Sequence, residues 1–140
     1  MINETKIKMR GHHLFCETIS NHEGKTVWCR EFCINMAKYQ ARMRSNDNQV
    51  IEIVYNCGDT CGYCTQNEDG KCRLYDFGPG DNGIDIRVLH RLDYKVGQEL
   101  TFGELKKRVR EAYGKELPDM CFTECGLSET LECAKGLREL

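Results

Sequence analysis

The chain has 140 residues, a formal net charge of -2 and ten cysteines, and each of these numbers excludes a class of protein. The balanced charge gives no electrostatic reason to expect nucleic acid, and cysteine, 10 of 140 or about 7%, stays below the roughly 8–10% of short disulfide scaffolds. No stretch approaches the roughly 18 apolar residues of a membrane span, and residues 1–25 lack a secretory apolar stretch. We therefore expect one cytoplasmic domain over 1–140, whose reduced thiols serve metal binding or catalysis rather than disulfides.

The first predicted elements are a short strand over residues 6–9 and a short helix within "RGHHLFCETI" at 10–19. A long amphipathic helix is predicted from Thr26 to Arg44 and ends at "SNDN". Its apolar stripe recurs at helical spacing and consists of Trp28, Phe32, Met36, Tyr39 and Met43.

A buried strand is predicted at "VIEIVY", residues 50–55, because the stretch is short and dominated by β-branched and aromatic residues. Residues 56–83 follow and are rich in Gly, Cys, Asp and Asn. A structureless loop of this length is uncommon inside a compact domain. We therefore expect a metal ion or cluster to organise it.

The rest of the chain predicts helices. One covers about 84–92, and a second begins where Thr101 and Glu104 form a capping-box pattern. The basic run "KKRVR" at 106–110 is expected on a solvated face of this second helix, and Ser128 is the expected N-cap of a last short helix. The predicted fold class is α+β: a mostly helical domain with a small two-stranded sheet and cysteine-rich metal-binding loops.

Six of the cysteines form two triads with similar spacing, and a close pair followed by a more distant third is typical of thiolate sites. The central triad is Cys61, Cys64 and Cys72, and the C-terminal triad is Cys121, Cys125 and Cys133. An all-thiolate site needs four ligands, so each triad lacks one. The fourth is expected from Cys16, from Cys57 or from the opposite triad.

Spacing alone separates an iron–sulfur cluster from zinc poorly, because both accept four thiolates in a roughly tetrahedral arrangement. The cysteines exceed the needs of one zinc site, and histidine is absent from both triads. These two features favour an iron–sulfur cluster of the [4Fe-4S] type, with zinc as the alternative.

The central loop also contains C-x3-C-x2-C at Cys57, Cys61 and Cys64, the pattern of radical S-adenosylmethionine enzymes. Those enzymes follow the pattern with most of a β/α barrel, which takes about 200 residues or more. Only 76 residues, 140 minus 64, follow Cys64. We therefore interpret the loop as a ligand loop of another kind, with Cys57 as a bystander.

The motif "RGHHLFC" at 10–16 offers other chemistry, since a helix would place His12 and Cys16 one turn apart with His13 beside them. An imidazole near a thiol can create a nucleophile, or the pair can ligate metal. Capped histidines beside a buried thiol are the structural alternative. Cys29 and Cys33, at i and i+4 of the long helix, are interpreted as structural thiols, and His22 and His90 receive no role.

The chain resembles the family called domain of unknown function 1284. The resemblance extends over nearly the whole chain and rests on "RGHHLFC", "CGYC" at 61–64 with Cys72, "RVLHRL" at 87–92 and the C-terminal triad ending in "GLREL". It implies a small iron–sulfur binding protein. The matching positions are Arg10, His12, His13, Cys16, Cys61, Cys64, Cys72, Cys121, Cys125 and Cys133, whereas Cys29, Cys33 and Cys57 are additional to the family's pattern and its tail pair is more often two residues apart.

The leading functional hypothesis is thus a small cytosolic iron–sulfur protein that transfers electrons to a redox partner protein or senses redox conditions. Its expected core ligands are Cys61, Cys64 and Cys72, with the fourth from Cys16 or the C-terminal triad. Two alternatives remain. One is an interaction module stabilised by four-thiolate zinc sites, and the other is a thiol enzyme or redox sensor that uses Cys16 with His12 and His13.

Overall fold

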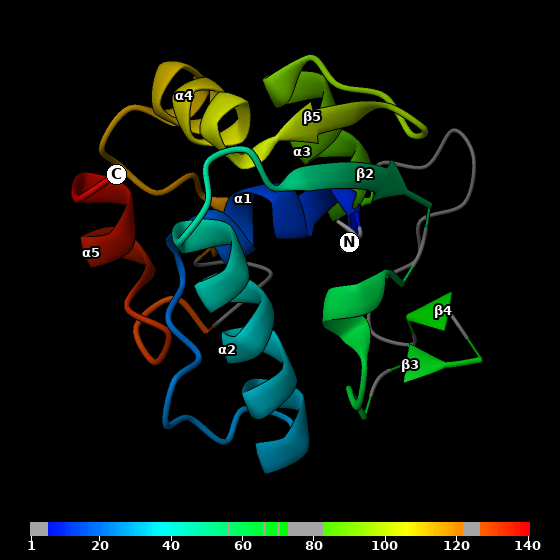
Figure 1. The fold of residues 1–140 in the computed structure, drawn as a ribbon. Helices are drawn as coiled ribbons and strands as arrows, with labels where there is room; N and C mark the ends of the chain where they lie inside the picture. The colour runs from blue at the N-terminus through cyan, green and yellow to red at the C-terminus, as the bar shows by residue number, and fades with distance from the viewer. Residues whose placement is uncertain (1–5, 56, 66, 70, 73–82, 122–126) are drawn as a thin grey trace.

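The computed structural model describes residues 6–55, 57–65, 67–69, 71–72, 83–121 and 127–140. Figure 1 shows β2 and β5 across the upper half of the view, α2 below them, and the small β3–β4 hairpin at the lower right. The elements are β1 (Ile7–Arg10), α1 (Gly11–Ile19), α2 (Arg30–Arg44), β2 (Val50–Val54), η1 (Asp59–Cys61), β3 (Asn67–Glu68), β4 (Lys71–Cys72), α3 (Ile84–Leu92), β5 (Glu99–Thr101), α4 (Phe102–Tyr113) and α5 (Cys133–Arg138).

The main sheet has three strands in the order β1-β2-β5. β1 pairs in parallel with β2, with Ile7 opposite Ile51 and Met9 opposite Ile53, and β5 pairs antiparallel on the other side of β2. These four side chains are fully buried because alternate residues of a strand face the same side. A parallel pair needs a long crossover connection, and α1 and α2 provide it here.

The predicted two-stranded sheet is wrong, although the α+β class is confirmed. The sequence analysis missed β5, which has only three residues and leads directly into α4. A strand this short leaves too few positions for an alternating pattern to be recognised. A second, two-stranded sheet of β3 and β4 also lies within residues 56–83, the segment predicted to be a loop.

The two predicted helices of the later chain are confirmed as α3 and α4. Thr101 caps α4 by accepting a hydrogen bond from the Glu104 backbone N–H at 3.3 Å, and Glu104 completes the capping box. The basic run 106–110 lies on α4, as predicted. Within the described segments, no helix is both long and apolar enough to cross a membrane.

The start of α2 differs from the prediction. The helix begins at Arg30, and Cys29 is its N-cap, whose sulfur accepts a hydrogen bond from the Phe32 backbone N–H. Trp28 lies before the helix with a φ of 63° and is 41% exposed, so it does not belong to the buried stripe. Because the chain turns at Trp28, the apolar stripe of α2 begins at Phe32.

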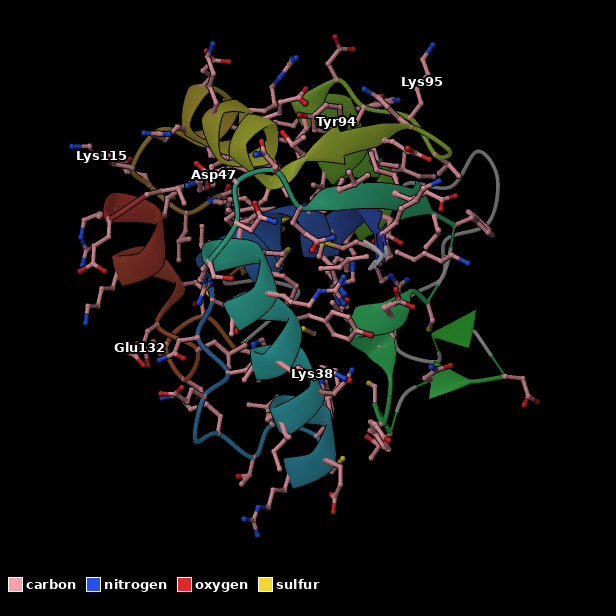
Figure 2. The ribbon with its side chains drawn as sticks, viewed as in Figure 1. Lys38, Asp47, Tyr94, Lys95, Lys115 and Glu132 are labelled. Atoms are coloured by element: carbon pink, nitrogen blue, oxygen red, sulfur yellow. The ribbon has the colours of Figure 1, made fainter. Side chains whose placement is uncertain are left out.

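The C-terminal helix also starts later than predicted. α5 begins at Cys133, and its N-cap is Glu132 in the left-handed conformation rather than Ser128. The Glu132 carboxylate, labelled in Figure 2, accepts hydrogen bonds from the Asn21 and Lys25 side chains at 3.2 Å. These contacts join the start of α5 to the segment between α1 and α2.

Candidate metal centre

Among the described residues, six cysteines from three separate stretches of the chain line one cavity of about 90 Å³. The lining cysteines are Cys16, Cys57, Cys61, Cys64, Cys121 and Cys133. Three histidines and one glutamate share the wall: His12, His13, His22 and Glu17. The fold therefore gathers thiols, imidazoles and a carboxyl group that lie as much as 121 positions apart, from residue 12 to residue 133.

Side chains of the motif at 10–16 line the cavity. The motif spans the junction where β1 ends at Arg10 and α1 begins at Gly11. A Cβ atom at Gly11 would lie 2.6 Å from the Asp85 carbonyl oxygen of α3, so only glycine lets the two helices approach this closely. α1 is buried along most of its length. His12 and His13 are consequently buried, whereas Cys16 is half-buried.

The cysteine loop, residues 57–64, contacts both β1 and α2. A Cβ atom at Gly58 would lie 2.4 Å from the Lys8 carbonyl oxygen, and the Lys8 backbone N–H donates to the Asp59 carboxylate at 2.8 Å. On the other side, the Asn35 side chain donates to the Asp59 carbonyl oxygen at 3.1 Å. These contacts fix the loop that carries Cys57, Cys61 and Cys64.

A buried ion pair between Arg10 and Asp85 contacts His12. Arg10 donates through Nε to Asp85 Oδ2 at 3.0 Å, while the His12 backbone N–H and ring Nδ1 lie 2.8 and 2.6 Å from Asp85 Oδ1. Burial alone would raise the pKa of Asp85, but the hydrogen bonds from His12 and the charge of Arg10 lower it to about 2. Burial lowers the pKa of His12, so at neutral pH a neutral imidazole faces an ionised carboxylate.

His13 connects the loop to α1. Its Nδ1 lies 2.7 Å from Thr60 Oγ1 and 3.9 Å from Cys61 Sγ, and its Nε2 lies 3.8 Å from Glu17 Oε2. Burial lowers the pKa of His13, which favours the neutral ring. Among the described contacts, the thiol nearest to His13 is that of Cys61. The predicted pairing of His12 and His13 with Cys16 stays a prediction.

A second polar cluster surrounds Glu17, which is only 2% exposed. Glu17 Oε1 accepts hydrogen bonds from Ser20 and from Gln40, and His22 Nδ1 lies 3.6 Å away. Burial raises the pKa of Glu17 to about 8 and lowers the pKa of His22 to about 4. Both groups are therefore neutral in the folded protein at pH 7.

Cys57 lines the same cavity as Cys61 and Cys64, and its interpretation as a bystander stays a prediction. Arg10 Nη1 lies 3.9 Å from Cys57 Sγ, and a hydrogen bond with Cys57, together with burial, raises the pKa of Cys61 to about 11. The Cys61 thiol is therefore protonated at neutral pH in the absence of metal. Metal binding would release this proton.

Cys29 and Cys33 are not among the residues that line the cavity. Cys29 Sγ donates to the Tyr63 carbonyl oxygen at 3.2 Å, and Cys33 Sγ donates to the Val27 carbonyl oxygen at 3.3 Å. Burial raises the pKa of Cys33. The contact of Cys33 is local, whereas that of Cys29 joins the start of α2 to the loop at Tyr63. The structural role of both thiols stays a prediction.

The structure thus brings together most of the predicted site residues, from both triads and from the motif at 10–16. Cys72 and Cys125 are the exceptions: Cys125 and the Cys72 side chain lie outside the described residues, although the Cys72 backbone pairs with Asn67, which lines the cavity. Among the described residues, no group of three or more His, Cys, Asp or Glu side chains has a geometry that could hold a metal ion.

The sequence analysis missed Glu17, Asp85 and the role of His22. Glu17 stands in the buried run "LFCETI", so a carboxyl group inside an apolar helix was a usable signal. Asp85 lies between two isoleucines in "IDIRV", but 73 residues separate it from His12. Nothing in the local pattern predicts that contact.

A family model described as "Protein of unknown function (DUF1284)" matches residues 28–130. The matched stretch includes the cysteine loop, α3 and Cys121, and it begins after the motif at 10–16. No curated protein and no solved structure matches the chain.

Proposed function

The chain belongs to the DUF1284 family, and we propose that it is an iron–sulfur protein that holds a [4Fe-4S] cluster in the cysteine-lined cavity. The observation that carries this proposal is the convergence of six thiols on one cavity. Thiolates are the ligands that hold iron–sulfur clusters. The kind of donor that lines the cavity therefore fits the group, although no three of the described His, Cys, Asp or Glu side chains are arranged to hold a metal ion.

We propose that the ligands form one site in this cavity rather than two separate sites. Cys61, Cys64 and Cys72 are the core ligands, as the sequence predicts, and the described two of them lie in one loop beside Asn67. The thiols available for the remaining position are Cys16, Cys57, Cys121 and Cys133. Because Cys121 and Cys133 line the same cavity, we assign any C-terminal ligand to this site rather than to a second one.

The bound cluster would accept and release single electrons, for exchange with a redox partner protein or for redox sensing. The chain supplies the surroundings that tune this chemistry. Arg10 is 1% exposed and reaches Cys57 Sγ, and apolar side chains such as Phe15, Ile84 and Leu131 line the wall. Hydrogen bonds to sulfur and exclusion of solvent are the main protein controls of cluster potential.

A zinc-stabilised interaction module is the second candidate, and the contact between Cys57 and Cys61 favours it. A hydrogen bond joins the two thiols, which places their sulfurs close enough to share one ion, since a Zn–S bond is about 2.3 Å long. In that case the ion would stabilise the loop and take no part in electron transfer. The thiol-enzyme hypothesis for Cys16 with His12 and His13 remains a third proposal.

The proposal is tested by anaerobic purification followed by iron, zinc and acid-labile sulfide analysis of the wild type and two variants. We expect iron and sulfide in about equal amounts in the wild type. Cys61→Ser should lose both, whereas Cys33→Ser, a buried thiol outside the cavity wall, should keep both. An iron-free wild type made without oxygen contradicts the proposal. Stoichiometric zinc without sulfide, from cells supplied with iron, establishes the zinc module instead.

A further inference from the structure

Two cysteines lie one helical turn apart at the start of α2. Cys29 is the N-cap, and its carbonyl oxygen accepts the Cys33 backbone N–H at 3.3 Å. The Val27 carbonyl oxygen accepts hydrogen bonds from both residues, from the Cys29 backbone N–H at 2.7 Å and from the Cys33 thiol at 3.3 Å. Side chains one turn apart on a helix have Cβ atoms about 5–6 Å apart, so a movement of about 1–2 Å brings the pair to disulfide geometry.

The two thiols differ in exposure. Cys29 is half-buried, whereas Cys33 is 1% exposed and packs with Phe32 and Met36. The Phe32 backbone N–H donates to Cys29 Sγ at 3.4 Å, and the N-terminus of a helix favours negative charge. Burial raises the pKa of Cys33, and the neighbouring Cys29 adds to this effect. An accessible thiol beside a second thiol that can resolve its mixed disulfide is the arrangement of redox-active cysteines.

The backbone around Cys29 is strained at two points. Trp28, the residue before it, has a φ of 63°. Tyr63, whose carbonyl oxygen accepts a hydrogen bond from the Cys29 thiol at 3.2 Å, has a φ of 65°. A bulky residue rarely adopts this left-handed conformation, and residues that do so cluster at functional sites. Trp28 and Tyr63 are also 41% and 71% exposed, so the segments that contact Cys29 present aromatic surface of the kind that binds polypeptides.

We propose that Cys29 and Cys33 form a redox-active dithiol that exchanges with disulfide bonds of peptides, with Cys29 as the attacking thiol and Cys33 as the resolving thiol. This activity goes beyond the structural role predicted for the two residues. It does not rest on the proposed cluster, because neither residue is among those that line the cavity.

The exchange has two steps that balance. Cys29 Sγ attacks one sulfur of the peptide disulfide, a mixed disulfide forms, and the other peptide sulfur leaves and takes the proton of Cys29. Cys33 Sγ then attacks Cys29 Sγ, and the second peptide sulfur leaves with the proton of Cys33. The chain ends with a Cys29–Cys33 disulfide, and the peptide ends with two thiols, having gained two electrons and two protons. Two molecules of a small thiol such as glutathione reverse these steps and regenerate the dithiol.

The test exposes the anaerobically purified wild type to rising ratios of oxidised to reduced glutathione, followed by thiol alkylation, trypsin digestion and mass spectrometry. Trypsin cleaves after Arg30, so Cys29 and Cys33 fall in separate peptides, residues 26–30 and 31–38, with one cysteine each. We expect these two peptides to become disulfide-linked as the ratio rises. Absence of this link at the most oxidising ratio overturns the inference.

Three variants test the two roles in the same assay. Cys33→Ser lacks the resolving thiol, so it should accumulate glutathione on Cys29, which the wild type releases. Cys29→Ser should lose the link and carry little glutathione on Cys33, and α2 should stay folded because serine is a preferred N-cap. Cys16→Ser, which removes a thiol of the cavity wall, is the control and should form the link as the wild type does. Equal glutathione on Cys29 in the wild type and in Cys33→Ser overturns the assignment of the resolving thiol.

Discussion

Two regions of the molecule are buried through different interactions. We call the region around the main sheet the sheet side and the region around the cysteine-lined cavity the cavity side. On the sheet side, strands β1, β2 and β5 pack with α3 and α4 through apolar side chains such as Ile51, Leu92 and Leu105. On the cavity side, the buried groups include charged and polar side chains, namely Arg10, His12, His13, Glu17, Thr60 and Asp85. The first region is stabilised mainly by apolar burial. The second depends on specific partners, because buried polar groups are costly when unsatisfied.

The two regions meet in one short stretch of chain. Ile7 and Met9 of β1 enter the apolar core, and the next residues, Arg10 to His13, enter the polar cluster. A substitution on the sheet side should therefore lower stability but leave the metal content unchanged. A substitution on the cavity side should lower both. The predictions below test this difference, from the largest expected effect to the smallest.

Asp85→Ala should have the largest effect, because it removes the acceptor for Arg10 and for two donors of His12. Breaking a buried ion pair costs about 3–5 kcal/mol, and we also expect loss of bound metal. The matched control is Glu99→Ala, which breaks the half-exposed ion pair with Lys6 and should cost less than about 1 kcal/mol. Urea denaturation with metal analysis checks both. Equal costs for the two variants would contradict the account.

Glu17→Gln should change how stability depends on pH in the metal-free protein. The folded pKa of Glu17 is raised to about 8 from 4.5, so the folded state holds a proton that the unfolded chain releases at lower pH. The contribution of Glu17 to stability should therefore fall as the pH rises from about 5 to 8, by up to roughly 4 kcal/mol at 1.36 kcal/mol per pH unit. Below about pH 6.5 the lowered pKa values of His12, His13 and His22 act in the opposite direction, so the net fall should be seen from about pH 6.5 to 8. Glu17→Gln should flatten this slope.

The measurement is urea denaturation at four pH values between 5 and 8. Glu111→Gln, an exposed position on α4, is the control and should keep the wild-type slope. A Glu17→Gln slope parallel to that of the wild type would show that Glu17 does not titrate as its burial implies.

Leu105→Ala should destabilise the sheet side and leave the cavity side intact. Leu105 is fully buried on α4, and truncation of a buried leucine costs on the order of 3 kcal/mol. We expect a lower denaturation midpoint but unchanged metal content per folded chain. Lys107→Ala, exposed on the same helix, should change neither. Loss of metal in Leu105→Ala would mean that the two regions are not separable.

Thr101→Ala should have the smallest effect. It removes the capping hydrogen bond to the Glu104 backbone N–H, which is worth about 1 kcal/mol. Thr101→Ser retains the hydroxyl and should recover most of the loss in thermal denaturation. A loss equal in both variants would show that the cap does not stabilise α4.

The sheet side was largely predictable from the sequence, because its signals are local. The β-branched and aromatic residues of the short stretch 50–55 predicted β2, the capping box predicted the start of α4, and the spacing of Ile84, Val88 and Leu92 predicted α3. The errors also have local causes. Cysteine is not a usual N-cap, so the N-cap of α2 at Cys29 was not predicted. The N-cap of α5, Glu132, was not predicted because a non-glycine residue with a positive φ is uncommon.

The cavity side was predictable only in part. Cysteine spacing identified Cys61 and Cys64, and the motif at 10–16 identified His12, because those patterns lie within a few residues. The hydrogen-bond partners on the cavity side come from distant elements: Asp85 of α3 contacts His12, and Gln40 of α2 contacts Glu17. Such contacts arise from packing of whole helices, as at Gly11, and no local pattern encodes them.

The most direct test of the central claim is hydrogen exchange of the metal-loaded protein before and after anaerobic chelation. If a bound cluster completes the cavity side, amides of residues 57–64 and 127–133 should lose most of their protection on chelation, while β2 and α4 keep theirs. Unchanged protection of residues 57–64, or an equal loss in β2 and α4, would contradict the division of the molecule into a packed side and a metal-dependent side.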